Sequence, residues 1–259
     1  MLATGISIRR PPRNAEASRH SAGFRVHHGP SAAPDLPLIG DMERFNDLDI
    51  PRTLEEVLVP QHLALVVYDV QVGILNQIAD SDLVLAQVRR VLDAARAARI
   101  RTFFTRHMSL PKPLMGRAQI RQAMAWQRLE TATDIRSPFL RDTPPFEIVP
   151  ELAPTANEAV FEKVAMSAFV GTPLDQVLRD CDVRAFAIVG VALEVGIEPT
   201  VRHGADLGYI PVLVADACGS GDPEAGDRSL ASLRFAGDVL ITDVDTVVQL
   251  IGRSSNPAQ

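Results

Sequence analysis

The stretch Leu63-Ala-Leu-Val-Val-Tyr68 is a continuous apolar run, and Asp69 follows it directly. A run of this length without alternating polar residues is typical of a strand that is buried on both faces of a parallel sheet. An acidic residue directly after such a strand lies at the mouth of the sheet, where it can serve in proton transfer. The same position also suits an ordinary turn or cap residue, so Asp69 alone does not identify a function.

Strands and helices alternate on the C-terminal side of this run. Residues 81–100 have the period of an amphipathic helix, with Val84, Val88 and Leu92 on one stripe. Similar patterns predict strands at 63–68, 102–105, 159–161, 185–189, 210–214 and 239–241. They predict helices at 53–58, 81–100, 115–130, 223–235 and 243–251. Two further helices are predicted, one that begins at Thr172 and one that follows the strand at 185–189 and ends at about 207. This alternation predicts a three-layer α/β/α fold around a mostly parallel sheet of roughly six strands. In such sheets the ligand site lies beyond the carboxyl ends of the strands.

The first 36 residues differ in composition from the rest of the chain. They contain five arginines and four prolines but two acidic residues, and they show no apolar periodicity. This composition predicts a disordered or arm-like tail over 1–36, followed by a single domain over 37–259. Two alternatives stay open, namely an organelle transit peptide and an arm that docks on a partner subunit.

Charge and cysteine content exclude several classes of protein. The net charge is −6 and the pI is about 5.5, whereas a general binder of nucleic acid or of a membrane surface normally has a basic face. No apolar run reaches the roughly 18 residues that a membrane helix needs. The two cysteines, Cys181 and Cys218, do not make a disulfide framework, so we expect a reduced, cytoplasmic setting.

Two other strand ends carry residues that suggest a site. Lys163 ends the predicted strand at 159–161 and is followed by Ser167-Ala-Phe169, while Val189-Gly-Val-Ala192-Leu-Glu-Val-Gly196 follows the strand at 185–189. A lysine at a strand end is usually a solvated head group, and a glycine at a strand-to-helix turn permits close backbone approach. Because the carboxyl ends of parallel strands meet at one edge, we expect Asp69, Lys163 and Gly196 to cluster there.

Taken together, these motifs resemble those of the isochorismatase-like hydrolase superfamily, which also contains nicotinamidases and N-carbamoylsarcosine amidases. The resemblance covers about residues 60–250 and rests on an Asp in a D-x-Q context, a Lys in a K-x-x-x-S-A-F context and a Gly-Val turn. It implies that Asp69 is the general acid/base and that Lys163 pairs with it and orients it. It also implies a cis peptide bond between Val191 and Ala192, and an oxyanion hole formed by the N–H groups of Ala192 and Gly196.

One position departs from the family pattern. The nucleophilic cysteine of the amidases should fall at residue 196, which is glycine here. Without a thiolate there is no thioester route. True isochorismatases also look to have glycine at this position. They cleave a vinyl ether by protonating a substrate carbon, a reaction that needs an acid but no nucleophilic side chain. They carry Tyr-Ala-His before Val-Gly, however, whereas this chain has Ala192-Leu193-Glu194.

The resemblance also suggests residues around the substrate. His107 ends the second strand near a position that faces substrate in relatives, an arginine in the following helix would suit a substrate carboxylate, and Glu194 adds a carboxylate near the turn. Each also has an ordinary structural interpretation, as a loop, surface or first-turn residue. The complete set of expected substrate-binding residues is Gln71, His107, Arg117, Arg121, Trp126, Phe169 and Glu194.

We expect neither a metal nor a cofactor. The Asp-x-His pattern of the nicotinamidase metal site is missing, and there is no Walker loop, dinucleotide fingerprint or CxxC pair. The resemblance implies a small-molecule substrate and a homo-oligomer.

Three functions therefore stay open. The first is a cysteine-independent hydrolase that uses Asp69 and Lys163, for which vinyl-ether cleavage is one reaction. The second is a C–N hydrolase that activates water directly, with Glu194 as a candidate helper. The third is a non-catalytic binding or scaffold protein, against which a buried Asp–Lys pair argues, because such a pair is a poor choice for stability alone.

Overall fold

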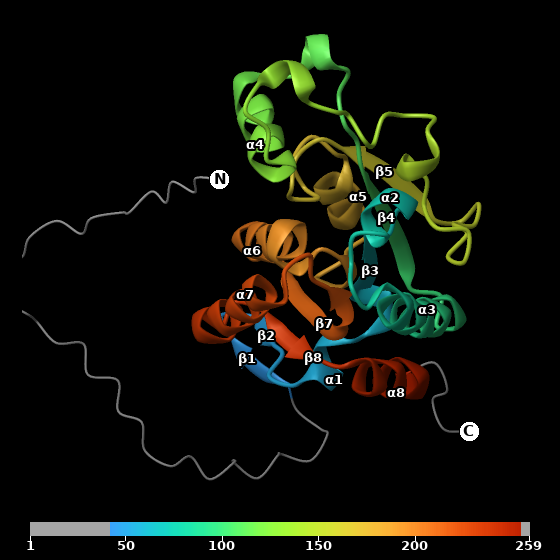
Figure 1. Ribbon diagram of the computed structural model, residues 1–259. Helices are drawn as coiled ribbons and strands as arrows, with labels where there is room; N and C mark the ends of the chain where they lie inside the picture. The colour runs from blue at the N-terminus through green and yellow to red at the C-terminus, as the bar shows by residue number, and fades with distance from the viewer. Residues whose placement is uncertain (1–41, 255–259) are drawn as a thin grey trace, which may run out of the picture. The chain divides into compact units, whose positions relative to one another are not determined.

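A six-stranded sheet forms the centre of the computed structural model, which describes residues 42–254 (Figure 1). The tail expected over 1–36 lies outside these residues. The strand order is β5-β4-β3-β6-β7-β8, and every neighbouring pair is parallel. This confirms the predicted sheet, whose strands are β3 (Leu63–Tyr68), β4 (Arg101–His107), β5 (Ala159–Lys163), β6 (Ala185–Val191), β7 (Ile210–Gly219) and β8 (Leu240–Thr242).

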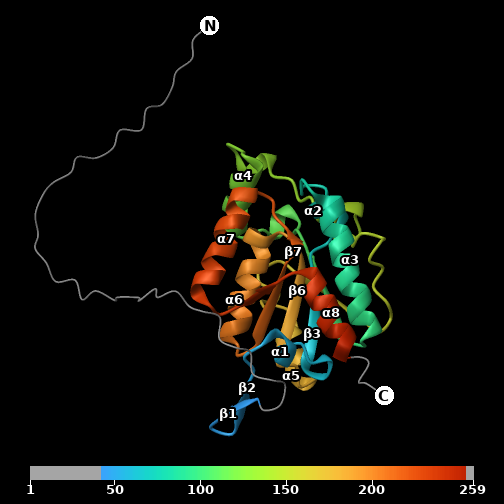
Figure 2. The ribbon, with the colours of Figure 1, turned by 90° about the horizontal axis from the view of Figure 1, so that it is seen from below.

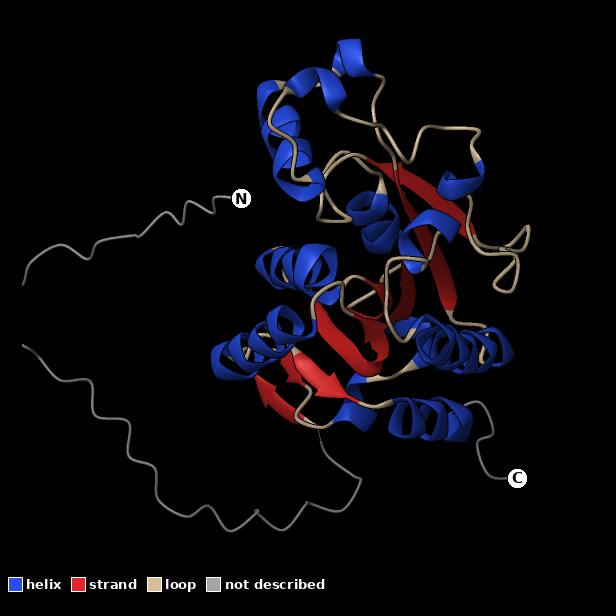
Figure 3. Ribbon diagram, in the orientation of Figure 1, coloured by secondary structure: helices blue, strands red, loops and turns tan. Residues whose placement is uncertain are grey.

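Helices cover both faces of the sheet, which makes the predicted three layers (Figures 2 and 3). Strand β3 is buried along its whole length, and its side chains alternate between two apolar clusters. Leu65 and Val67 pack with helices α3 (Ser81–Ala97) and α8 (Val244–Ser254). Val66 and Tyr68 pack on the opposite face with α5 (Leu174–Asp180), α6 (Glu198–Asp206) and α7 (Pro223–Ala236).

The order of the strands places a switch point between β3 and β6. From β3 the chain continues through β4 to β5 on one side, and from β6 it continues through β7 to β8 on the other. The loops that leave β3 and β6 therefore diverge at their carboxyl ends, where ligands bind in open α/β sheets. Asp69 follows β3, and Ala192 follows β6.

A long connection between β4 and β5 lies beyond this edge. It contains α4 (Arg117–Gln127) and short 3₁₀ turns, of which η4 (Pro144–Phe146) contacts the short helix α2 (Val72–Leu75). In Figures 1 and 2, α4 lies beyond the carboxyl ends of the strands. The helix predicted over 115–130 is thus present but shorter.

Several element boundaries differ from the predictions. The predicted capping box of the first helix is confirmed, with Thr53 as cap of α1 (Leu54–Val57). Pro173 is itself the cap of α5 instead of its first residue, although the Thr172 hydroxyl does accept a hydrogen bond from the Leu174 N–H. The segment after β6 begins with a π-helical turn, Leu193–Ile197, before α6 starts.

A hairpin at the start of the described chain was not predicted. Strands β1 (Glu43–Phe45) and β2 (Leu48–Ile50) pair in antiparallel fashion around Asn46 and Asp47, both of which have positive φ. Asn and Asp tolerate this conformation, which two-residue hairpin turns require. Strands of three residues are too short for their alternation to be visible in the sequence. Among residues 42–254, no helix is long and apolar enough to cross a membrane.

Candidate active site

The structure brings Asp69 and Lys163 into direct contact, as the sequence predicts. The ammonium Nζ of Lys163 donates to Oδ2 of Asp69 at 2.6 Å, and the hydroxyl of Thr105 donates to Oδ1 at 2.6 Å. The Asp69 N–H in turn donates to the Thr105 hydroxyl at 3.2 Å. A carboxylate with one fixed donor on each oxygen has a single orientation, yet each oxygen keeps a lone pair for a further partner.

Lys163 holds Asp69 from the side that faces away from the cavity. Its side chain is fully buried and does not line the adjacent cavity, and it also donates to the Tyr68 hydroxyl at 2.7 Å and to the Ala165 carbonyl at 3.2 Å. Burial lowers the pKa of Lys163, and the Asp69 carboxylate partly opposes this shift. Lys163 is therefore a positioning residue, whereas Asp69 faces the cavity.

The ring of Tyr68 fills the space where a side chain at residue 196 would lie. A Cβ atom added to Gly196 would fall 2.5 Å from Cζ and 2.7 Å from Cε1 of Tyr68, and closer still to the hydroxyl oxygen. Real Cβ contacts essentially never fall below 3.0 Å. The hydroxyl donates to the Met166 carbonyl and accepts from Lys163, so the ring is held at both sides of its oxygen. Burial raises the pKa of Tyr68 well above its ordinary value, which keeps the phenol neutral.

Hydrogen bonds of the Thr200 hydroxyl hold the turn that carries Ala192 and Gly196. The Thr200 hydroxyl donates to the Gly196 carbonyl at 2.7 Å and accepts from the Ala168 N–H at 3.0 Å. The Val191–Ala192 bond is cis, which confirms the prediction from the resemblance. The N–H of Gly196, however, donates to the Ala192 carbonyl at 3.0 Å within the π-helical turn. Of the two N–H groups expected to form an oxyanion hole, that of Gly196 is therefore already engaged within the turn.

These groups line a cavity of about 500 Å³ at the carboxyl ends of β3 and β6. Asp69, Tyr68, Ala192 and Gly196 form its inner wall. His107 and Trp126 line it as predicted, and so does Arg128, which ends α4 in a left-handed conformation. We call this space the reactive cavity.

His107 is a neutral imidazole at the wall of the reactive cavity. Burial lowers its pKa, and the nearby Lys163 ammonium lowers it further against the opposing charge of Asp69. Its Nδ1 atom is buried without a hydrogen-bond partner in the described structure. Because Nδ1 is buried, the ring nitrogen that could meet a polar group in the cavity is Nε2.

Gln71 is fully buried and does not line the reactive cavity. Its amide accepts from the His107 N–H at 2.6 Å and donates to the carbonyls of His107 and Phe146 at 3.1 and 2.7 Å. The structure thus gives Gln71 a role in positioning His107, in place of the expected contact with substrate.

Four other predicted residues also lie outside the reactive cavity. Phe169 is a core residue that stacks on Tyr209 with ring centroids 5.8 Å apart. Arg117 and Arg121 are exposed on α4 and do not line the reactive cavity. Glu194 accepts from the N–H groups of Gly221 and Asp222 at 2.8 and 2.9 Å, so one of its oxygens holds the loop before α7, while the other is buried without a partner.

Three residues that shape the site were missed by sequence reasoning. Thr105 and Tyr68 lie within or at the end of predicted strands, and a polar or phenolic side chain at a strand end was the available signal. Arg128 had no local signal, because its place depends on where α4 ends. No group of three or more His, Cys, Asp or Glu side chains in residues 42–254 is arranged to hold a metal ion.

The half-buried imidazole of His107 should make the fold sensitive to acid. Its pKa is lower in the folded chain than the value of about 6.5 in the unfolded chain, so the unfolded state binds a proton first as the pH falls. Its contribution to stability is therefore complete above pH of about 6.5 and declines as the pH falls through the lower folded pKa. His107→Asn should lose less stability than the wild type between neutral and mildly acidic pH, as measured by urea unfolding. Equal losses in the two proteins would contradict this.

Comparison with known proteins agrees with the fold. The isochorismatase domain model matches residues 63–244. Ureidoacrylate amidohydrolase from Serratia proteamaculans is 28% identical over 198 residues, which cover 70% of this chain and 80% of that protein. Its counterpart from Acinetobacter baylyi is 28% identical over 181 residues, which cover 64% and 74%.

Solved structures share the fold. A cysteine hydrolase from Pseudomonas syringae pv. phaseolicola has a TM-score of 0.64 at 23% identity, and the match covers 84% of this chain and all of that one. N-carbamoylsarcosine amidase from Thermoplasma acidophilum has a TM-score of 0.57 at 20% identity, with 71% and 96% covered.

Proposed function

The chain is a hydrolase of the isochorismatase family, and from this premise we propose that it cleaves its small-molecule substrate without a cysteine nucleophile. Asp69 is the general acid/base, Lys163 holds it, and water is the nucleophile. The bond that is cleaved is the C–N bond of an amide or ureide.

The observation that carries this proposal is the contact between Tyr68 and Gly196. The family nucleophile would arise from residue 196, and the Tyr68 ring occupies the volume that its Cβ would need. Cys218 does not replace it, because it is half-buried, does not line the reactive cavity and has a thiol pKa that burial raises. A thiol with a raised pKa is a poor nucleophile. Asp69, held in position by Lys163, is then the group that catalyses hydrolysis.

The geometry supports Asp69 as the base that activates water. Thr105 and Lys163 each donate to one carboxylate oxygen, which leaves acceptor sites directed at the reactive cavity. Asp69 takes a proton from water, the hydroxide oxygen adds to the carbonyl carbon, and Asp69 returns that proton to the departing nitrogen as the C–N bond breaks. The Ala192 N–H is placed to stabilise the negative oxygen of the intermediate. Glu194 is tied to the loop before α7 and has no part in this scheme.

The curated relatives support the proposed substrate class. Ureidoacrylate amidohydrolases act on a C–N bond, and this chain shares 28% identity with two of them over about two thirds of its length. Vinyl-ether cleavage is the second candidate, favoured by the glycine at residue 196. It would use Asp69 as an acid toward carbon, whereas both donors at Asp69 suit a carboxylate that accepts protons. The scaffold alternative is set aside, because the family match supports an enzyme.

We also retain the expectation of a cytoplasmic homo-oligomer. The hairpin of β1 and β2 exposes Phe45 and Leu48 at 65% and 63%, and a second copy of the chain would cover such an apolar surface.

A substrate screen with a thiol reagent tests the proposal. We expect turnover of one or more ureides or primary amides, no turnover of vinyl ethers, and an unchanged rate after alkylation of accessible cysteines. The reason is that neither Cys181 nor Cys218 lines the reactive cavity. Loss of activity in Cys218→Ala, with folding verified by circular dichroism, would assign the nucleophile to Cys218. Turnover of vinyl ethers alone would establish the second candidate.

A further inference from the structure

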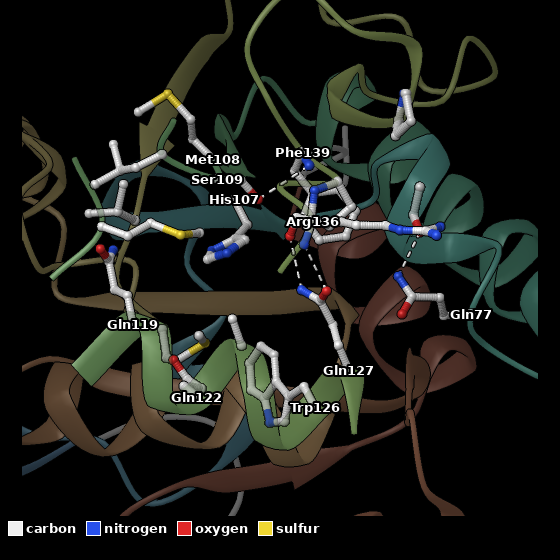
Figure 4. A pocket seen from close by; sticks show the side chains of 18 residues that line it. Gln77, His107, Met108, Ser109, Gln119, Gln122, Trp126, Gln127, Arg136 and Phe139 are labelled. Carbon is white, nitrogen blue, oxygen red and sulfur yellow. Dashed lines mark hydrogen bonds between the residues drawn. The ribbon is translucent and has the colours of Figure 1, made fainter. Parts of the chain in front are cut away.

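A second cavity of about 420 Å³ adjoins the reactive cavity (Figure 4). The two cavities share the wall formed by Gln77, His107, Trp126, Phe139 and Met166. The second cavity lies on the side of the β4–β5 connection, under α4 and the segment that follows it. We call this space the distal cavity.

The walls of the distal cavity differ from those of the reactive cavity. Among the described residues that line it, no carboxylate is present, and Arg136 is the one with a permanent charge. Methionine thioethers and the Trp126 ring supply apolar wall, and the amides of Gln119 and Gln122 lie on α4 (Figure 4). The reactive cavity, by contrast, contains the carboxylates of Asp69 and Asp222 together with the guanidinium of Arg128. An anionic group is therefore repelled less at the distal end.

Arg136 is held in place through its backbone. The amide of Gln127 accepts from the Arg136 N–H and donates to the Arg136 carbonyl, both at 2.9 Å (Figure 4). These two bonds fix the segment after α4 against the helix. Arg136 is exposed to solvent at the edge of the cavity, and its guanidinium makes no ion pair with any described residue. Its fork of N–H donors is thus available for a planar, two-oxygen acceptor.

We propose that the distal cavity binds the carboxylate at the non-reacting end of an elongated substrate, through Arg136. The reacting group lies beside Asp69, and the chain between them passes the shared wall at His107 and Trp126. The identity of the reacting group rests on the proposed function, but the anion site does not. The enzyme would therefore prefer long carboxylated substrates to short or uncharged ones.

Trp126 gives a direct readout of binding. It is the single tryptophan of the chain and lines both cavities, so its fluorescence reports occupancy. We would titrate the wild type with linear alkanoates, from butanoate to octanoate, and with the alcohols of equal length. These probes contain no bond that the enzyme hydrolyses, so the titration does not depend on the proposed reaction.

We expect the alkanoates to bind more tightly than the alcohols, with Arg136→Gln weakening alkanoate binding at least about tenfold and leaving the alcohols unaffected. Arg89→Gln is the matched control, because Arg89 is exposed on α3, lines neither cavity and carries the same charge. Equal affinity of acids and alcohols, or no effect of Arg136→Gln, would overturn the proposal. So would a loss caused by Arg128→Gln in place of Arg136→Gln, since that would locate the anion in the reactive cavity.

A kinetic comparison separates this proposal from the proposed function. For ureides with a terminal carboxylate, Arg136→Gln should raise KM about tenfold or more and leave kcat unchanged. For ureides without the carboxylate, neither constant should change. If no ureide is hydrolysed but alkanoate binding depends on Arg136, the proposed reaction is wrong and the anion site stands.

Discussion

The Asp69→Asn variant is expected to lose at least about 10²–10⁴-fold in kcat, because asparagine retains the shape of the side chain but cannot take a proton from water. In the wild type the Asp69 carboxylate is held by Lys163 and Thr105 and faces the reactive cavity. The other carboxylate that lines this cavity, Asp222, caps α7 by accepting from the Ala225 N–H. Single-turnover kinetics on the substrate found by screening would measure the loss. A rate close to that of the wild type would rule out Asp69 as general acid/base.

A paired variant separates chemistry from stability. Lys163→Met leaves the buried Asp69 carboxylate with the Thr105 hydroxyl as its remaining donor, so we expect a loss of about 3–5 kcal/mol in the free energy of unfolding. Asp69→Asn should cost less. Burial already lowers the pKa of Lys163, and its ammonium can release its proton when the carboxylate is gone. Urea unfolding of both variants at one pH would test this order, and the reverse order would contradict the positioning role of Lys163.

Adding a single methyl group at residue 196 is expected to have the second large effect. In Gly196→Ala the new Cβ meets the Tyr68 ring at 2.5–2.7 Å, which the ring can relieve only by leaving its bonds to Lys163 and Met166. Overpacking of this kind typically costs about 1–3 kcal/mol. The change should also displace Lys163, and with it Asp69, so activity should fall together with stability.

A double-mutant cycle isolates the contact between the two residues. In a Tyr68→Val background the clash is gone, so Gly196→Ala should cost less there, with a coupling energy of about 0.5–3 kcal/mol. In a Tyr68→Phe background the ring remains and the cost should persist. Gly252→Ala serves as control, because a Cβ there has open space within α8 and should be neutral or stabilising. Equal costs of Gly196→Ala in the wild-type and Tyr68→Val backgrounds would show that the ring does not fill this space.

The fold could be predicted from the sequence because each long element carries a regular pattern. The apolar run of β3 and the stripe of α3 repeat with the periods of a buried strand and an amphipathic helix. The hairpin of β1 and β2 has no such pattern. Its strands have three residues each and bury no side chain, so no alternation of apolar and polar residues is needed. The extra length of β7 arises from pairing with β6 across a register shift, which depends on the tertiary structure.

The site could be predicted in part. Asp69 follows β3 and Lys163 is the last residue of β5. The two residues meet because these strands end at the same edge of one sheet, and strand ends can be located from sequence. The direction in which a side chain of a motif points cannot be predicted from sequence. Gln71 and Phe169 belong to the family pattern, yet one binds backbone groups and the other packs in the core. The distal cavity depends on how the β4–β5 connection folds back, which no local pattern specifies.

The contact between Tyr68 and Gly196 also restricts the order in which this sequence can change. With tyrosine at residue 68, any side chain at residue 196 lowers stability, because its first atom collides with the ring. The same penalty operates in reverse, since tyrosine would collide with a side chain already present at residue 196. A change at either residue is therefore tolerated better after a change at the other, so the history of residue 196 is tied to that of residue 68.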